Sequence, residues 1–135
     1  MKLSKKAEYA LRALVAMGRE REGTNFSIQD LARSEDIPLK FLEQILLALK
    51  NGGLLKSKRG VGGGYQLVTP PARITLGEVV TLFDGPFDPL PGAGHVALSE
   101  VFVELRDQVA QWLGDHTIAQ IIERERSSET VSFEI

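Results

Sequence analysis

The sequence predicts a mostly α-helical fold with one small β-hairpin, and three observations support this class. Apolar residues recur at steps of three and four residues in several segments that are separated by turn-forming residues. Residues 54–68 instead have the pattern of two short strands around the string GVGGG. Residues 98–113 keep the helical spacing without a break and form the longest amphipathic segment of the chain.

Two helices are expected before residue 37. The first runs from Ser4 to about Arg21, because its apolar residues fall on one stripe. Residues 23–26 then interrupt the helical pattern. Ser27 can cap a short second helix, since Asp30 stands three residues later in the first turn.

A third helix is expected to follow directly. Pro38 fits its first turn, where the missing N–H would have no partner within the helix. Gly52 and Gly53 can adopt the left-handed conformation that commonly ends a helix. The buried stripe of this helix is expected to comprise Leu42, Ile45, Leu46 and Leu49.

The hairpin and a fourth helix come next. The two arms are expected at Lys56–Arg59 and Tyr65–Val68, joined by glycines that tolerate positive φ. The string Thr-Pro-Pro closes the second arm. Thr75 and Glu78 have the spacing of a capping box, which predicts a short helix that stops at residues 84–86.

The C-terminal part begins with a loop. Residues 85–97 contain three prolines and three glycines and have neither a helical nor a strand period. The long helix from Leu98 to Leu113 follows and ends at Gly114.

A short last helix and a tail complete the chain. Thr117 and Gln120 have the spacing of a second capping box. From Ser127 the chain is mostly polar, apart from the alternating residues Val131, Phe133 and Ile135. This alternation favours an extended segment, and a disordered end is the alternative.

Composition limits the class of protein. The chain has 135 residues, of which 43% are hydrophobic and 25% are charged, as expected for one soluble globular domain with a small extension. No apolar run approaches the roughly 18 residues of a membrane span, and no apolar secretion signal follows the N-terminus, so a cytoplasmic location is expected. Cysteine is absent, which excludes disulfides, thiolate catalysis and cysteine-ligated metal within this sequence.

Charge is divided along the chain. Residues 1–75 contain 13 lysines and arginines and 7 acidic residues, a balance of +6, whereas residues 76–135 contain 3 and 11, a balance of −8. Lysine and arginine supply most nucleic-acid affinity by neutralising phosphates. The division therefore predicts that the first part binds a polyanion and that the second part faces protein, the alternative being charge distributed by chance.

Three helices followed by a basic hairpin have the outline of a winged helix-turn-helix. The polar side of its third helix carries Lys40, Glu43, Gln44 and Lys50. Gln44 can pair with adenine, Lys40 can donate to guanine or phosphate, and Glu43 can accept from the amino group of cytosine. Phosphates repel a carboxylate unless it finds a donor such as the cytosine amino group. Glu43 would therefore discriminate against sites that lack this base. An ordinary solvated polar face is the alternative for this helix.

The hairpin supplies the second half of the predicted DNA-binding surface. It carries Lys56, Lys58 and Arg59, and Arg59, next to the glycine turn, is expected to enter the minor groove. A phosphate-cradling nucleotide loop is the rival interpretation of these glycines. It is disfavoured because Tyr65 stands where a dinucleotide motif needs its third glycine, and because the Lys-Ser/Thr pair of a triphosphate loop is missing.

The motifs resemble those of the Rrf2 family of bacterial winged-helix regulators. The resemblance runs from MKLSKKAEYALRAL through IPLKFLEQIL and LLKSKRGVGGGYQL to ITLGEVV, and resumes weakly in WLGDHTIAQII. It implies a homodimer on a palindromic operator, with Lys40, Glu43, Gln44 and Arg59 at the DNA and the long helix at the dimer contact. The dimer residues are then expected to be Val101, Phe102, Leu105, Val109, Trp112 and Leu113.

One departure from the family pattern concerns the sensor. Many members hold an iron-sulfur cluster through cysteines in the loop before the dimer helix, and this chain has none there. Glu8 resembles an acidic cluster ligand of some relatives, but ion pairing with Lys5 or Arg12 along the helix is the favoured interpretation. His95 is a second weak metal candidate, since a lone histidine has no partner ligands. No cofactor or metal is therefore expected.

The expected organisation is a DNA-binding domain over 1–83, a linker or effector loop over 84–97, dimerisation helices over 98–126 and a tail over 127–135. The leading hypothesis is a dimeric, cluster-free, sequence-specific transcriptional regulator that represses by occluding a promoter. Its expected partners are double-stranded DNA, a second copy, and a protein or small-molecule effector, with no membrane. The alternative is an interaction module that docks a protein through its acidic half, and an enzyme is disfavoured because two histidines without cysteine assemble no catalytic set.

Overall fold

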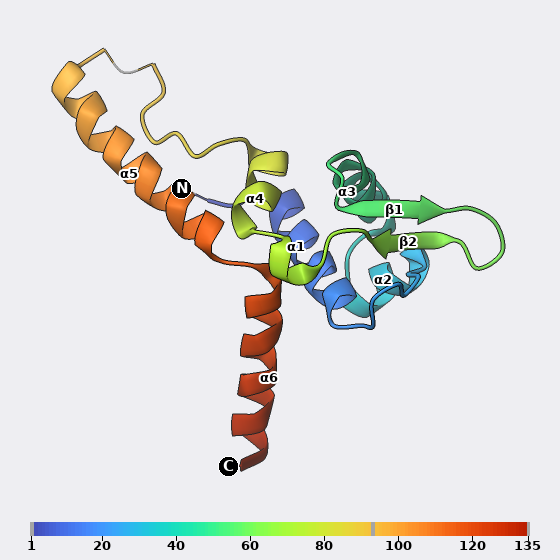
Figure 1. Ribbon diagram of the computed structural model, residues 1–135. Helices are drawn as coiled ribbons and strands as arrows, with labels where there is room; N and C mark the ends of the chain where they lie inside the picture. Colours follow the sequence, from blue (N-terminus) through green and yellow to red (C-terminus); the bar gives the residue numbers. More distant parts are fainter. Residues whose placement is uncertain (1, 93, 135) are drawn as a thin grey trace.

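The computed structural model describes residues 2–92 and 94–134, with side chains described to residue 129. Its elements run, in order, α1 (Lys5–Gly18), α2 (Ile28–Glu35), α3 (Leu39–Asn51), β1 (Leu55–Lys58), β2 (Gly64–Leu67), the 3-10 helix η1 (Pro71–Arg73), α4 (Leu76–Asp84), α5 (Val96–Asp115) and α6 (Ile118–Glu134). The two strands form one antiparallel hairpin (Figure 1). The fold is mostly helical with a small hairpin, and the predicted class is confirmed.

Side-chain caps fix where the helices begin. Ser27 accepts a hydrogen bond from the backbone N–H of Asp30 and so opens α2. At α4 the capping box is complete, because Thr75 accepts from the N–H of Glu78 while the Glu78 carboxylate accepts from the N–H of Thr75. Local hydrogen bonds of this kind depend on residues three apart, which is why the sequence predicts them.

The hydrophobic core forms around α1, which contacts α2, α3, α4 and α6. Every predicted stripe residue of α3 is fully buried against it, namely Leu42, Ile45, Leu46 and Leu49. The side chain of Tyr9 meets that of Phe41 edge-on, with ring centroids 5.6 Å apart. One side of α3 is thus fixed to α1, and the opposite side is left to solvent.

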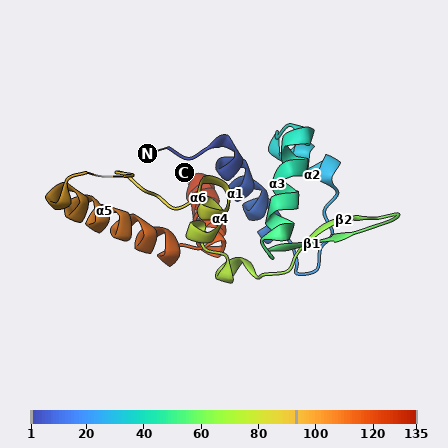
Figure 2. The same ribbon diagram turned by 90° about the horizontal axis from the view of Figure 1, so that it is seen from above.

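The last two helices extend away from this core. In Figure 1, α5 projects on the side opposite the hairpin, and Figure 2 shows the same separation from above. The predicted capping box of Thr117 and Gln120 is present at the start of α6. Ile118 and Ile122 at the beginning of α6 are buried in the core, and the N–H of Ile118 donates to the carbonyl of Ile74.

Several boundaries differ from the sequence predictions. The long helix α5 begins at Val96, inside the predicted loop and not at Leu98, and it continues through Gly114 to Asp115. The first helix ends at Gly18 and not near Arg21, and the hairpin arms begin one residue earlier than expected. The prediction of an extended or disordered tail is wrong from Ser127 to Glu134, where α6 continues as helix. No glycine or proline interrupts the chain there, so nothing ends the helix. Ile135 lies outside the described residues, as do the side chains of Val131 and Phe133.

Among the described residues, no helix has both the length and the apolar character that crossing a membrane requires.

Candidate nucleic-acid interface

The exposed side of α3 presents the four polar residues that the sequence predicts for DNA reading. Lys40, Glu43, Gln44 and Lys50 are all exposed. The helix begins at Leu39, so Pro38 is the N-cap and does not lie in the first turn as predicted. The end of the helix is followed by Gly53 in the left-handed conformation with φ of 84°. The helix is therefore short, anchored on one side and accessible along the other, as a helix that enters the major groove must be.

The hairpin follows α3 in the sequence, and its turn extends well beyond α3 in space (Figure 1). Lys56 pairs with Gln66 and Lys58 with Gly64 in the antiparallel register, so both lysines project from the same face of β1. Arg59 follows the strand directly and begins the turn. All three cations are exposed, and the structure thus carries them on one projecting wing.

The loop between α1 and α2 holds the base of this wing. Phe26 and Tyr65 exchange two backbone hydrogen bonds, of 2.8 and 2.9 Å, across an antiparallel bridge. The side-chain amide of Asn25 donates to the carbonyl of Gly62. The wing is thus tied to the body on its β2 side by contacts that are distant in sequence, and the sequence alone gave no signal for them.

Two glycines of the wing are required by close contacts. A Cβ atom on Gly64 would lie 2.1 Å from the carbonyl oxygen of Phe26, and the φ of this glycine is +154°. A Cβ atom on Gly63 would lie 2.5 Å from the carbonyl oxygen of Lys58. Only glycine therefore permits the hairpin to close its turn and approach the α1–α2 loop at the same time.

The cations of this surface have no acidic partner among the described residues. The ion pairs of the described chain lie elsewhere, for example between Arg19 and Glu125 at 3.2 Å and between Arg33 and Asp30 at 3.6 Å. On this surface the cations without an ion pair are Lys40 and Lys50 on α3 and Lys56, Lys58 and Arg59 on the wing. Their charge is available to an external anion.

One exposed residue of α3 is apolar and is not among the predicted DNA-binding residues. Leu47 is 50% exposed and lies on the same side of the helix as Glu43 and Gln44. A leucine has no hydrogen-bonding group, so the polar pattern that predicts the other four residues does not include it. Helical spacing of about 100° per residue does indicate its exposure, because Leu47 falls outside the buried stripe.

The long helix α5 has no fully buried residue. It packs on α4, where Gly77 lies next to Leu113 and Gly114. Of the predicted dimer residues, Phe102, Val109 and Leu113 are half-buried. Val101, Leu105 and Trp112 remain exposed, at 59%, 41% and 55%. The ring of Trp112 stacks on that of His116, with centroids 4.0 Å apart. The stripe is otherwise largely open to solvent within the described part of the chain.

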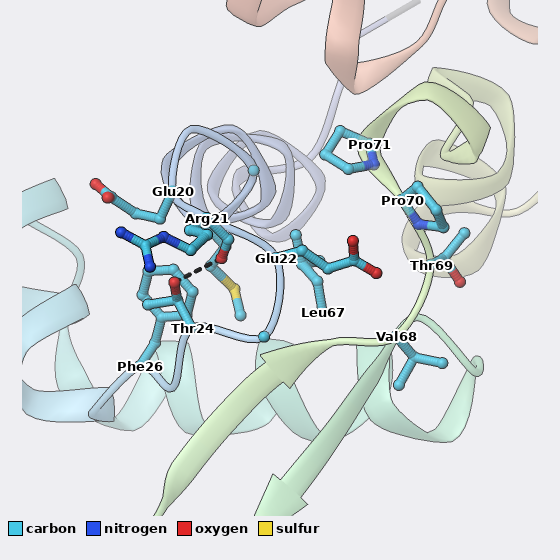
Figure 3. A pocket seen from close by; sticks show the side chains of 13 residues that line it. Glu20, Arg21, Glu22, Thr24, Phe26, Leu67, Val68, Thr69, Pro70 and Pro71 are labelled. Atoms are coloured by element: carbon cyan, nitrogen blue, oxygen red, sulfur yellow. Dashed lines mark hydrogen bonds between the residues drawn. The ribbon is translucent and has the colours of Figure 1, made fainter.

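Two hollows of the described chain differ in the room that they offer a ligand. An open cavity of about 420 Å³ lies between α4 and α5, at the start of the predicted effector loop, and includes Phe87 and Arg106 in its wall. A smaller one, of about 110 Å³, lies between the end of α1 and the chain that follows β2, with Met17 and Leu67 among its lining residues (Figure 3). Pockets for drug-sized ligands usually measure 300–1,000 Å³, so the cavity beside α5 has room for such a molecule and the smaller one does not. Among the described residues, open hollows of about 390, 340 and 410 Å³ also lie along α1, α2 and α6.

Neither weak metal candidate has the surroundings of a metal site. Glu8 forms ion pairs with Lys5 at 3.5 Å and with Arg12 at 3.9 Å. Ion pairing along the helix is the interpretation that the sequence favours over metal binding. His95 caps α5, since its Nδ1 accepts from the N–H of Leu98 at 3.2 Å. Within the described ranges, no group of three or more histidine, aspartate or glutamate side chains could hold a metal ion.

Comparison with known proteins places this geometry among transcriptional regulators. A family model described as Rrf2, iron-dependent transcriptional regulator, matches residues 3–124. The chain is 36% identical over 130 residues to Rv1287 of Mycobacterium tuberculosis, named as an HTH-type transcriptional regulator, covering 90% of this chain and 81% of that protein. It is 27% identical over 130 residues to IscR of Escherichia coli, covering 90% and 80%.

CymR of Bacillus subtilis is similar in both sequence and structure. The two sequences are 30% identical over 123 residues, which cover 90% of this chain and 89% of CymR. Its solved structure, described as that of the global cysteine regulator, superposes with a TM-score of 0.81 over 92% of this chain and 98% of CymR.

Proposed function

The chain belongs to the Rrf2 family of transcriptional regulators, and we propose that it represses transcription as a homodimer bound to a palindromic operator. One observation carries the proposal. The exposed side of α3 and the projecting wing together hold five exposed cations without acidic partners among the described residues. The other cations without an ion pair are spread over the rest of the described chain, namely Lys2, Lys6, Arg21, Arg73 and Arg124. A fixed helix beside a basic wing suits the major groove and the neighbouring backbone.

The side chains divide the work of recognition. Gln44 and Lys40 meet base edges in the major groove, where amides pair with adenine and lysine with guanine. Glu43 accepts from cytosine and repels phosphates when no such donor is present. Arg59 enters the minor groove, and Lys50, Lys56 and Lys58 neutralise phosphates.

Dimerisation uses the exposed stripe of α5. Val101, Leu105 and Trp112 are large apolar side chains that water would otherwise cover. A second copy related by a two-fold axis presents the same stripe and buries both. Two wings and two α3 helices then meet two half-sites of one operator.

The iron implied by the family description does not fit this chain. The chain contains no cysteine, and the described part of the α4–α5 loop offers Asp88 and His95 as its only ligand types. His95 already accepts a hydrogen bond from the N–H of Leu98 through Nδ1. We therefore propose that the chain regulates transcription without an iron-sulfur cluster. We also propose that it is not an enzyme.

Replacement of Arg59 by alanine tests the proposal. Each wing loses one minor-groove cation, which costs about 1–3 kcal/mol of binding free energy, so the dimer should bind at least about tenfold more weakly. The slope of log K against log salt should also fall by about two, one for each wing. Fluorescence anisotropy on a duplex selected from a random library measures both. The control is Arg126→Ala, since Arg126 lies on α6 and pairs with Glu123 at 3.9 Å. Equal binding by the wild type, Arg59→Ala and Arg126→Ala would refute the proposal.

Replacement of Glu43 by alanine should broaden sequence preference. The cytosine contact is lost, and discrimination at that base pair should decrease by about 1–3 kcal/mol. The variant Glu43→Gln keeps an acceptor oxygen but no charge, so it should bind all duplexes more tightly and still prefer cytosine. Repeating the library selection with each variant measures these preferences. An unchanged preference in Glu43→Ala would remove Glu43 from the reading set.

A further inference from the structure

The exposed side of α3 has an apolar residue at its centre. Leu47 is 50% exposed, and at about 100° per residue it lies between Glu43 and Gln44 around the helix axis. The buried stripe that ends at Leu49 faces the opposite way. An isolated exposed leucine is common on protein surfaces, but this one stands in the middle of the surface that the proposed function turns toward the bases.

We propose that Leu47 determines sequence specificity by contacting the C5-methyl group of a thymine in the major groove. This inference rests on the proposed function. Of the four bases, only thymine presents a methyl group there, and apolar side chains recognise it. The other groups on the base edges are hydrogen-bond donors and acceptors, and a leucine that covers them leaves them without a partner. The thymine methyl group is therefore the favourable contact for this side chain.

Spacing along the helix selects the base pair. Leu47 follows Gln44 by three residues, about 4.5 Å along the helix axis, which is close to the rise of about 3.4 Å between base pairs. The thymine is therefore expected in the base pair next to the one that Gln44 reads. Its partner would be an adenine on the opposite strand, so each half-site should contain a fixed A·T pair at this position.

The surroundings of Leu47 do not suit a protein-docking patch. The neighbouring exposed residues of α3 are Glu43, Gln44 and Lys50, and they are all polar. Leu39, 40% exposed, is the next large apolar residue on this side, and it lies two turns away along the helix. Sites that bind protein usually expose a contiguous apolar area, whereas a single apolar side chain among polar ones matches a single methyl group among base edges.

Deoxyuridine substitution tests this contact because it removes only the methyl group. Each thymine of the selected duplex is replaced in turn, in both half-sites together, and binding is measured for the wild type and for Leu47→Ala. A buried methyl contributes about fourfold in affinity for each half-site, so one substitution should weaken wild-type binding by about fifteenfold. Leu47→Ala should bind the unmodified thymine duplex about as weakly as the wild type binds the deoxyuridine duplex. Its affinity should not change when the same thymine is replaced by deoxyuridine.

Controls separate this inference from the proposed function. Leu82→Ala removes a leucine of similar exposure, 42%, on α4 and should respond to deoxyuridine as the wild type does. Wild-type binding that is indifferent to every deoxyuridine, or a Leu47→Ala variant that keeps the full response, overturns the role of Leu47 and leaves the Arg59 result standing. If the library yields no selected duplex at all, the proposed function fails and this inference fails with it.

Discussion

Replacement of Val101 by glutamate is expected to abolish dimerisation and, with it, tight operator binding. Val101 is 59% exposed on the apolar stripe of α5, so most of its side chain faces solvent in one protomer. In the proposed dimer the two-fold axis places a buried, unpaired carboxylate on both sides of the contact, and an unpaired buried charge costs several kcal/mol. The protein should therefore sediment as a monomer at concentrations where the wild type is a dimer.

Loss of the dimer also removes the link between half-sites. Joining two binding modules raises overall affinity by about 10²–10⁴, so the Val101→Glu monomer should bind the operator at least about 100-fold more weakly than the wild type. A single half-site should bind both proteins similarly. Val103→Glu is the matched control, because Val103 is 39% exposed and lies about 160° around α5 from Val101. A dimeric Val101→Glu protein would place the interface elsewhere, and a monomer with full operator affinity would refute cooperation between half-sites.

Sequence predicted the parts of this molecule that depend on neighbours in the chain. The caps of Ser27, Thr75 and Thr117 join groups three residues apart, and the structure contains all three. The buried stripe of α3 follows from helical spacing alone and is also present. By contrast, the bridge between Phe26 and Tyr65 joins segments that the chain brings together only on folding. A wing tied to the body therefore could not be foreseen.

The tail shows how a short pattern can mislead. Val131, Phe133 and Ile135 alternate as in a strand, but three residues carry little weight against a helix already propagating from Ile118. Extending an existing helix adds one hydrogen bond for each residue that is fixed, whereas starting a new element requires a costly nucleus. The exposure of Leu47 follows from helical spacing, but its proposed contact with thymine does not follow from the hydrogen-bonding pattern that predicts the other residues of α3.

Replacement of Gly64 by alanine should have the largest effect on the wing. The new Cβ would lie 2.1 Å from the Phe26 carbonyl oxygen and 2.8 Å from its carbon, both of which are backbone atoms. A φ of +154° is also unfavourable for any residue with a side chain. The hairpin must therefore separate from the α1–α2 loop and lose the bridge between Phe26 and Tyr65, at a cost of about 3 kcal/mol in the free energy of unfolding.

Gly62 separates conformational strain from this collision. It has a φ of +76°, but a Cβ there meets nothing within 4 Å, so Gly62→Ala should cost only about 1–2 kcal/mol. Urea unfolding measures both variants. Because a displaced wing no longer presents Arg59, Gly64→Ala should also bind operator as weakly as Arg59→Ala, whereas Gly62→Ala should retain most of its affinity. Equal stability of the two variants would mean that the bridge to the α1–α2 loop does not hold the wing, and the position of Arg59 would then depend on β1 alone.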